Sequence, residues 1–549
     1  MRGFKTNMNF TIKSNLIDLV SNDIYAAEVV IENNIITAIR RIDETLNTFI
    51  LPGFIDAHVH IESSMLVPSE FARIAVTHGT IGTISDPHEI ANVLGIEGVD
   101  YMVNNANQVP FYLYFGAPSC VPATHFETAG AIIDSKGIDE LLSRKEIVYL
   151  AEMMNFPGVI YKEEEVLRKI SAAKKHNKPI DGHAPGLMGE EMKAYFSAGI
   201  STDHECFKYD EALEKLKQGV HILIREGSAA KNFDTLIPLI ESYPKQIMFC
   251  CDDKHPDNLM EGHINQHVKR ALTKGYNLFD VLRASSYNVI KHYQLPIGLL
   301  QVGDTADFIE IDNLTEFNIL KTFINGANVA ERGISYIPIL DAPIVNNFNC
   351  SLKQPVDFEL KASSEHIRVI EALEGQLITN EIHANGILNN GFIESDLEND
   401  ILKIAVVNRY HDAPISIGFI KNIGLKQGAI ASCVAHDCHN IVVVGTNTTD
   451  MAHAVNLIIK AKGGISLSNG SEEMVLELPI AGIMTNKPAE EVAELYTAID
   501  KRAKELGSKL KAPYMTLSFM ALLVIPNLKL SDKGLFNGKR FEFTDVFMN

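Results

Sequence analysis

Two histidines separated by one residue, His58 and His60, end a short apolar stretch near the start of the chain. The stretch has the β-prone composition of a strand, and side chains at positions i and i+2 of a strand point the same way. The two imidazoles are therefore expected to face one point in space, as metal ligands do. A pair of hydrogen-bonded structural histidines fits the same pattern, so the interpretation depends on ligands supplied elsewhere.

Histidine and carboxylate side chains also end other β-prone stretches. His183 and His204 each end one, and Glu152 and Asp252 each follow an apolar run directly. A carboxylate in that position is costly to bury unless a cation pairs with it. Four histidines and one aspartate suit two divalent metal ions if one more anionic group bridges them, and we predict that Glu152 is that group. The alternative for Glu152 is a solvent-exposed position at the barrel rim. Asp253, the residue after Asp252, fits a helix N-cap instead of a ligand.

The β-prone stretches recur along the chain, and helical or loop segments separate them. Their ranges are 54–60, 80–86, 111–116, 147–152, 179–183, 201–204, 220–225 and 246–252. Eight strand–helix units in about two hundred residues predict an α/β fold, a (β/α)8 TIM-like barrel with polar residues at the carboxyl ends of its strands. A doubly wound sheet is the alternative, but it does not bring the ends of the first, fifth, sixth and eighth strands together. We therefore place a metal-dependent barrel at residues 52–295.

Two further domains are expected on either side of the barrel. Residues 1–51 and 296–345 consist of short β-prone runs, and a small sheet of this kind does not stand alone. We predict that the two pieces join into one small discontinuous β-sandwich domain. Residues 355–549 mix strand and helix patterns and are expected to form a C-terminal α+β domain.

Composition excludes several classes of function. The 549 residues carry a formal net charge of −20 and no Lys/Arg-rich tract, which argues against a nucleic-acid partner. The seven cysteines lack regular spacing, which is typical of reduced thiols rather than a disulfide framework. The most apolar run, 515–525, is too short to span a bilayer. We expect a cytoplasmic protein with no membrane partner.

Several longer motifs carry a family resemblance. They are PGFIDAHVH at 52–60, HIESSM at 60–65, SDPHEIANV at 85–93, AEMMNFPGV at 151–159, GHAPGL at 182–187, the segment 298–307 and AHDCHN at 435–440. Together they resemble the amidohydrolase superfamily and, within it, the bacterial-type adenine deaminases. The resemblance covers essentially the whole chain, although the family more often has serine where Cys438 stands.

The resemblance implies a reaction and its cofactors. The expected activity is hydrolysis of adenine to hypoxanthine and ammonia, in purine salvage or catabolism, by a hydroxide that bridges two divalent metal ions. Manganese or iron is expected, and zinc is possible, because imidazole and carboxylate ligands accommodate all three. Adenine and water are the expected small-molecule partners, and a homodimer is the expected assembly.

Catalytic roles follow from this chemistry. Asp252 is expected to accept the proton of the attacking hydroxide and pass it to the leaving ammonia. Negative charge then develops on the ring, so N1 must be protonated or hydrogen-bonded, and His88 and Glu89 are the candidates for that contact or for a further metal. The alternative for His88 and Glu89 is a helix N-terminal turn. Glu62 and Ser63 either line the substrate pocket or orient His60.

A second histidine pair, His436 and His439, flanks Asp437 in the C-terminal region. The pair is a candidate for substrate binding, because it could close the site over the barrel mouth or bind a further metal. A surface turn ahead of the next strand is the alternative.

Two other functions are weighed against deamination. Another amidohydrolase reaction, such as hydrolysis of a cyclic amide or an N-acetyl group, would use the same barrel. Amidohydrolases of the cyclic-amide type usually bridge their metals with a carboxylated lysine, and the stretch 147–154 contains no lysine. A catalytically inactive scaffold barrel is the third hypothesis, but it predicts missing ligands, and all six positions are filled.

Overall fold

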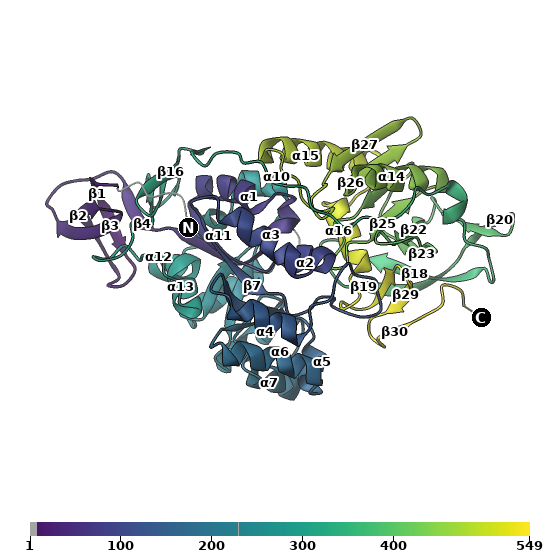
Figure 1. Cartoon of the computed structure of the whole chain (residues 1–549), viewed down its shortest axis with the longest axis horizontal. Helices are drawn as coiled ribbons and strands as arrows, with labels where there is room; N and C mark the ends of the chain where they lie inside the picture. The colour runs from purple at the N-terminus through teal and green to yellow at the C-terminus, as the bar shows by residue number, and fades with distance from the viewer. Residues whose placement is uncertain (1–7, 229, 549) are drawn as a thin grey trace.

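Three parts lie side by side along the long axis of the molecule: a small β domain, a central barrel and a C-terminal domain (Figure 1). The computed structural model describes residues 8–228 and 230–548. The first seven residues of the expected small domain therefore lie outside the described residues. Within the described ranges, no helix has the length and apolar character needed to cross a bilayer.

The small β domain is one eight-stranded sheet built from both flanks of the barrel. Its order is β17-β16-β15-β14-β4-β1-β2-β3, and β4 pairs with β14 so that Pro52 faces Phe308. The sheet curls, because Phe10 in the first strand stacks on Phe323 at 5.6 Å. The strands are β1 (Phe10–Asp18), β2 (Asp23–Glu32), β3 (Ile35–Arg41), β4 (Phe49–Pro52), β14 (Phe308–Ile311), β15 (Ile319–Ile324), β16 (Ala327–Glu331) and β17 (Ile334–Ser335).

The predicted barrel is confirmed. Parallel ladders join β5 to β9 in order and β10 to β12 in order. The two sets of strands are joined by a hydrogen bond from the Ser201 N–H to the carbonyl of Ile180 at 2.9 Å. Strand β13 pairs with β5 and closes the ring. The strands are β5 (Phe54–His60), β6 (Thr80–Ser85), β7 (Tyr112–Ala117), β8 (Ile147–Met153), β9 (Ile180–Gly182), β10 (Thr202–Asp203), β11 (His221–Arg225), β12 (Ile247–Cys250) and β13 (Asp252–Asp253).

Helices cover the outside of the barrel, so its strands are buried on both faces, as in other parallel sheets. Every residue of β5 is buried, including the charged ones. The helices of this part of the chain are α1 (Pro68–Ala75), α2 (His88–Leu94), α3 (Ile96–Ala106), α4 (Ser135–Ser143), α5 (Phe156–Ile160), α6 (Glu164–Lys175), α7 (Gly189–Ser197), α8 (Tyr209–Lys217), α9 (Phe233–Leu236), α10 (Pro256–Glu261), α11 (Ile264–Thr273), α12 (Leu278–Leu282) and α13 (Asn288–Tyr293).

The C-terminal domain is built on a second eight-stranded sheet, in the order β19-β18-β23-β22-β25-β24-β26-β27. A smaller hairpin, β20–β21, and a three-stranded sheet, β28–β30, flank it. The strands are β18 (His366–Ala372), β19 (Thr379–Asn385), β20 (Ile387–Asn389), β21 (Phe392–Glu394), β22 (Ile401–Val407), β23 (Ser416–Lys421), β24 (Ala429–Ser432), β25 (Ile441–Gly445), β26 (Gly464–Asn469), β27 (Glu472–Glu477), β28 (Leu528–Ser531), β29 (Gly534–Asn537) and β30 (Glu542–Phe543).

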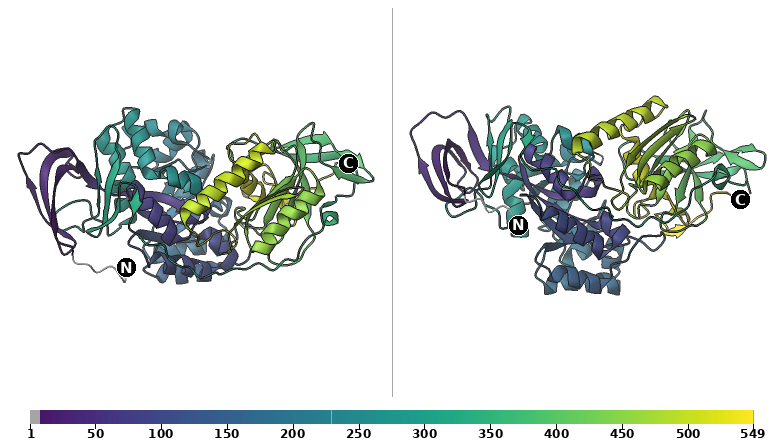
Figure 2. Two further views of the ribbon diagram at one scale, coloured as in Figure 1. Left: turned by 90° about the horizontal axis from the view of Figure 1, so that it is seen from above. Right: turned by 45° about the horizontal axis from the view of Figure 1, so that its top comes forward.

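Alternation along β22 divides the C-terminal core into two. Ala405 and Val407 pack with α14 (Thr448–Ala461), whereas Ile404 and Val406 belong to the large apolar core that also contains the barrel. This is the period of two that a strand imposes. Helices α15 (Ala489–Glu505) and α16 (Pro513–Ser518) lie on the barrel side, and Figure 2 shows the long helix α15 where the two domains meet. The C-terminal domain therefore packs directly over one end of the barrel.

Candidate metal centre and active site

All six side chains predicted as metal ligands come together at the carboxyl ends of the barrel strands, and all are buried. They are His58 and His60 on β5, Glu152 on β8, His183 after β9, His204 after β10 and Asp252 on β13. The spacing of the first pair works as expected, because Nε2 of His58 lies 3.2 Å from Nε2 of His60. His58 also stacks on His204, with ring centroids 4.1 Å apart.

Glu152 divides its two carboxylate oxygens between two sets of histidines. Oε1 lies 3.3 Å from Nε2 of His60. Oε2 lies 2.6 Å from Nδ1 of His183 and 3.2 Å from Nε2 of His204. Burial opposes ionisation of Glu152, but His183 and His204 outweigh it and hold its pKa well below the usual range. The carboxylate is therefore charged and placed between two groups of nitrogen donors.

Asp252 approaches the same cluster from the end of the eighth barrel strand. Its Oδ1 lies 3.2 Å from Nε2 of His60 and 3.5 Å from Nε2 of His58. The backbone at Asp252 is left-handed, with φ of 59°, which is uncommon for a residue with a side chain and is tolerated best by Asn and Asp. This turn separates β12 from β13 and directs the carboxylate to the histidines. Such strained positions concentrate at functional sites.

The donor set fits a pair of divalent cations. The Nε2 atoms of His58 and His60 lie 3.2 Å apart and face one point, and the buried Nε2 of His183 has no hydrogen-bond partner among the described residues, as expected of ligand atoms. Ligand atoms within 4.8 Å of one another form several overlapping groups, among them His58, His204 and Asp252, and Glu152, His183 and His204. Nitrogen and carboxylate oxygen donors suit manganese, iron and zinc. The residues present therefore fit the predicted cofactor.

Two charged residues that we did not single out from the sequence complete the rim. Arg225, at the end of β11, pairs with Oδ2 of Asp252 at 2.5 Å and also pairs with Glu205. Burial opposes ionisation of Asp252, but Arg225 and His58 outweigh it and hold its pKa well below the usual range. Arg225 ends β11 and Glu205 lies two residues after β10, so the rule that polar side chains gather at the carboxyl ends of barrel strands would also have identified them.

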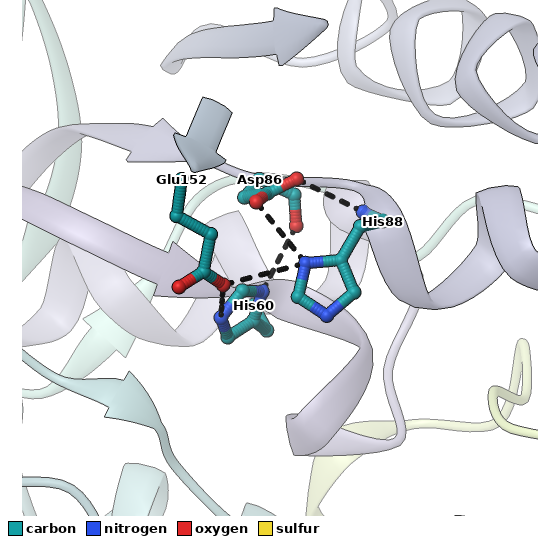
Figure 3. Close-up of side chains that lie close together, drawn as sticks. All are labelled: His60, Asp86, His88 and Glu152. Atoms are coloured by element: carbon teal, nitrogen blue, oxygen red, sulfur yellow. Dashed lines mark hydrogen bonds and ion pairs between the residues drawn. The ribbon is translucent and has the colours of Figure 1, made fainter. Parts of the chain in front are cut away.

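His88 extends the cluster on the side of the second barrel strand (Figure 3). Its Nδ1 lies 3.1 Å from Oδ2 of Asp86 and 3.4 Å from Oε1 of Glu152. Nδ1 of His60 lies 3.1 Å from the carbonyl oxygen of Asp86, which orients the His60 ring. His88 begins α2, so the helix-turn interpretation describes its backbone while its side chain faces the cluster.

The C-terminal domain contributes side chains to the same site. Glu89 pairs with Nδ1 of His436, and its Oε2 lies 2.5 Å from Nε2 of His439. Asp437 lies near His88, with Oδ1 3.7 Å from Nε2. Both histidines are buried, which contradicts the alternative of a surface turn. The site is thus assembled from two domains.

Glu62, Ser63 and Asp253 hold neighbouring segments in place. A Glu62 carboxylate oxygen accepts the Ile90 backbone N–H at 3.2 Å, and burial raises the pKa of Glu62 to about 7. Ser63 Oγ donates to Oδ1 of Asp253 at 2.5 Å. The N-cap of the next helix, α10, is His255, so the N-cap interpretation of Asp253 is wrong. Of these three residues, only Asp253 lines the cavity at the cluster.

Asp56 connects the two strands that carry His58 and Asp252. Its Oδ1 accepts the backbone N–H of His58 at 3.2 Å and that of Cys251 at 3.0 Å. Its Oδ2 lies 2.9 Å from Nε2 of His263, whose Nδ1 lies 2.7 Å from Thr80 Oγ1. Because Asp56 is fully buried, this network fixes the relative position of the first and last barrel strands behind the ligands.

A buried lysine holds the loops that carry His183 and His204. Lys215 Nζ donates to Oδ2 of Asp203 at 2.6 Å, to Oε1 of Glu211 at 2.8 Å and to the carbonyl of Ala184 at 2.8 Å. Glu211 also accepts the Gly186 backbone N–H at 2.8 Å. Lys215 and Asp203 are both fully buried, so removing one partner leaves the other charge uncompensated.

Replacing Lys215 with methionine is expected to lower the free energy of unfolding by about 3–5 kcal/mol, the usual cost of breaking a buried ion pair. Chemical denaturation followed by circular dichroism measures it. Lys217→Met, on the exposed side of the same helix, is the matched control and should have little effect. Equal stability of the two variants would contradict the role assigned to Lys215.

Comparisons with known proteins separate the C-terminal domain from the part of the chain that contains the barrel. The Amidohydrolase family matches residues 49–329, and the Adenine deaminase C-terminal domain matches residues 376–542. A protein named adenine deaminase from Sulfurovum sp. (strain NBC37-1) is 53% identical over 97% of this chain and 99% of its own length. A protein of the same name from Salinibacter ruber is 50% identical over 98% of this chain and 99% of its own length. Another, from Methanosarcina mazei, is 48% identical over 97% of this chain and 98% of its own length.

Proposed function

The chain belongs to the adenine deaminases of the amidohydrolase family, and from this premise we propose that it hydrolyses adenine to hypoxanthine and ammonia at the cluster of six ligands. The observation that carries the proposal is Glu152, whose two oxygens face different histidines. Glu152 offers the carboxylate that a two-metal hydrolase needs as a bridge. Amidohydrolases of the cyclic-amide type usually have a carboxylated lysine in that role. The proposed enzyme is therefore an aminohydrolase that acts on a purine base.

Two divalent cations are proposed as the cofactor, with manganese or iron preferred and zinc possible. His58, His60 and Asp252 would hold one, His183 and His204 the other, and Glu152 would contact both. Bound at this position, such cations lower the pKa of water and so supply a nucleophile near neutral pH. A homodimer is the proposed assembly, and light scattering of the purified protein measures it.

Asp252 is the proposed proton carrier. Its Oδ1 faces the histidines, while Arg225 holds Oδ2 and keeps the carboxylate ionised before reaction. Water adds to C6 of adenine, and Asp252 accepts its proton. The same proton then passes to the amino group, the C6–N bond breaks, and ammonia leaves. The second proton of the water ends on N1 as the C6–O bond becomes a carbonyl, so one water is consumed and the ring becomes hypoxanthine.

His88 and Glu89 are proposed to bind N1 of the ring. Both line the cavity at the cluster, on the side where His436 and Asp437 of the C-terminal domain approach. Nε2 of His88 lies 3.4 Å from Oε1 of Glu89, so both polar groups face the same part of the cavity. A hydrogen bond at N1 stabilises the charge that develops when water adds to the neighbouring C6.

The protein loaded with manganese is expected to convert adenine to hypoxanthine with release of one ammonia per base. The absorbance change of the purine and a coupled ammonia assay measure the two products separately. Dihydrouracil and an N-acetylated sugar serve as controls for cyclic-amide and N-acetyl hydrolysis. Absence of hypoxanthine from protein with verified metal content would contradict the proposed function.

A further inference from the structure

An apolar roof covers the active site. We use the term roof for Leu377, Phe519, Leu522 and Val524, which line the cavity at the cluster together with polar residues of the barrel. The cavity has a volume of about 30 Å³, enough for one or two water molecules. Pockets for small ligands usually measure about 300–1,000 Å³. The roof must therefore shift before a bicyclic purine can bind.

A larger cavity is also lined by Phe519. This outer cavity, about 430 Å³, is lined by side chains of the barrel, such as His255, and of the C-terminal domain, such as Tyr496 and Lys511. Phe519 lines both cavities, so the two cavities adjoin at this residue. It also stacks on His436, with centroids 5.3 Å apart. The outer cavity has the size of a small-molecule pocket and adjoins the site where the roof closes it.

Lys529 connects the two segments that form the roof. Its Nζ donates to the carbonyl of Leu377 at 2.6 Å and to the carbonyl of Phe519 at 2.9 Å. The side chain is fully buried, and burial lowers the pKa of Lys529 to about 7. An amine is costly to bury unless its donors are satisfied. Its two carbonyl partners make Lys529 a clamp that holds the roof segments together.

Resting on the proposed function, we propose that the roof restricts this enzyme to free bases, with Phe519 as the main determinant against purines substituted at N9. The amino group at C6 must face the polar side of the cavity, where Asp252 lies. N9 belongs to the other ring, so the N9 edge faces the roof. A substituent there meets apolar side chains, and the hydroxyls of a ribose would be buried without partners.

Phe519→Ala is expected to raise the ratio of kcat/KM for 9-methyladenine to kcat/KM for adenine by about 10–200-fold, the range that one methyl group commands in an apolar pocket. Leu522→Ala should raise the ratio in the same direction by less. Lys529→Met should also raise it, because the roof segments lose their clamp. If these changes only disturbed the structure, kcat/KM would fall for both adenine and 9-methyladenine, and the ratio of the two would stay the same.

Phe536→Ala is the matched control, because Phe536 is buried in the same domain and packs on Phe126, with centroids 4.9 Å apart. It lines neither cavity and should leave the ratio unchanged. If the wild type deaminates adenine and the ratio stays constant in the Phe519, Leu522 and Lys529 variants, the inference is wrong and the proposed function stands. If the metal-loaded wild type does not deaminate adenine, the proposed function is wrong and this inference falls with it. If Phe519→Ala does not fold, Leu522→Ala decides.

Discussion

Replacing Asp252 with asparagine is expected to lower kcat for adenine by about 10²–10⁴-fold, the contribution of a positioned acid–base group. The amide has nearly the same shape, but it cannot accept the proton of the attacking water. It also loses the ion pair with Arg225, whose guanidinium then keeps the carboxylate of Glu205 and the carbonyl of Ala230 as partners. Steady-state kinetics with adenine measures the effect, and circular dichroism checks that the barrel is folded.

The kinetics of Asp252→Asn can be interpreted once the metal content of the variant is known. Asp252 also contacts His58 and His60, so a lower rate could reflect loss of a ligand as well as loss of a base. Mass spectrometry of the metals in the purified variant separates the two, because Glu152 and four histidines remain. Asp234→Asn, an exposed aspartate paired with Arg270, is the control. Near-normal turnover by Asp252→Asn would contradict the proposed role.

The barrel could be predicted because its strands are continuous apolar runs that end in polar residues. Parallel strands covered by helices on both faces have that pattern, and the eight predicted ranges overlap all of the strands β5 to β13, the last range covering both β12 and β13. Details of local backbone could not be predicted. The stretch 246–252 divides into β12 and β13, and Asp252 adopts a left-handed conformation, which Asp tolerates better than most residues but which its type alone does not predict at a given position.

The candidate site could be predicted in its barrel half, whereas in its C-terminal half the sequence offered His436 and His439 as candidates without fixing what they contact. Side chains at strand ends meet wherever a barrel closes, so His183 and His204 could be placed beside His58 from the sequence alone. The contact of Glu89 with His436 joins residues 347 positions apart and depends on how two domains pack. The same packing places Phe519 over the site, and local sequence carries no signal for it.

Replacing Glu152 with glutamine is expected to weaken metal binding by about 100-fold or more, since changes to groups that only orient a ligand already cost about 10–100-fold. Glutamine keeps one oxygen acceptor, so one set of histidines retains its partner. The other set faces an amide N–H₂, which donates hydrogen bonds and cannot coordinate a cation. The loss should therefore be larger than for a ligand that contacts one metal only.

Metal content after dialysis and the thermal shift on adding Mn²⁺ measure this loss without reference to turnover. A ligand that binds only the folded state stabilises it in proportion to the logarithm of its concentration over Kd, so the wild type should gain stability with Mn²⁺. Glu152→Gln should gain little at the same concentration, whereas Glu164→Gln, an exposed glutamate on α6, should behave as the wild type does. Because Glu152 is the group whose oxygens face both histidine sets, it is the residue at which a two-metal site and a one-metal site differ most. Full retention of both metals by Glu152→Gln would mean that the carboxylate does not bridge, and the proposal would then need another anion between them.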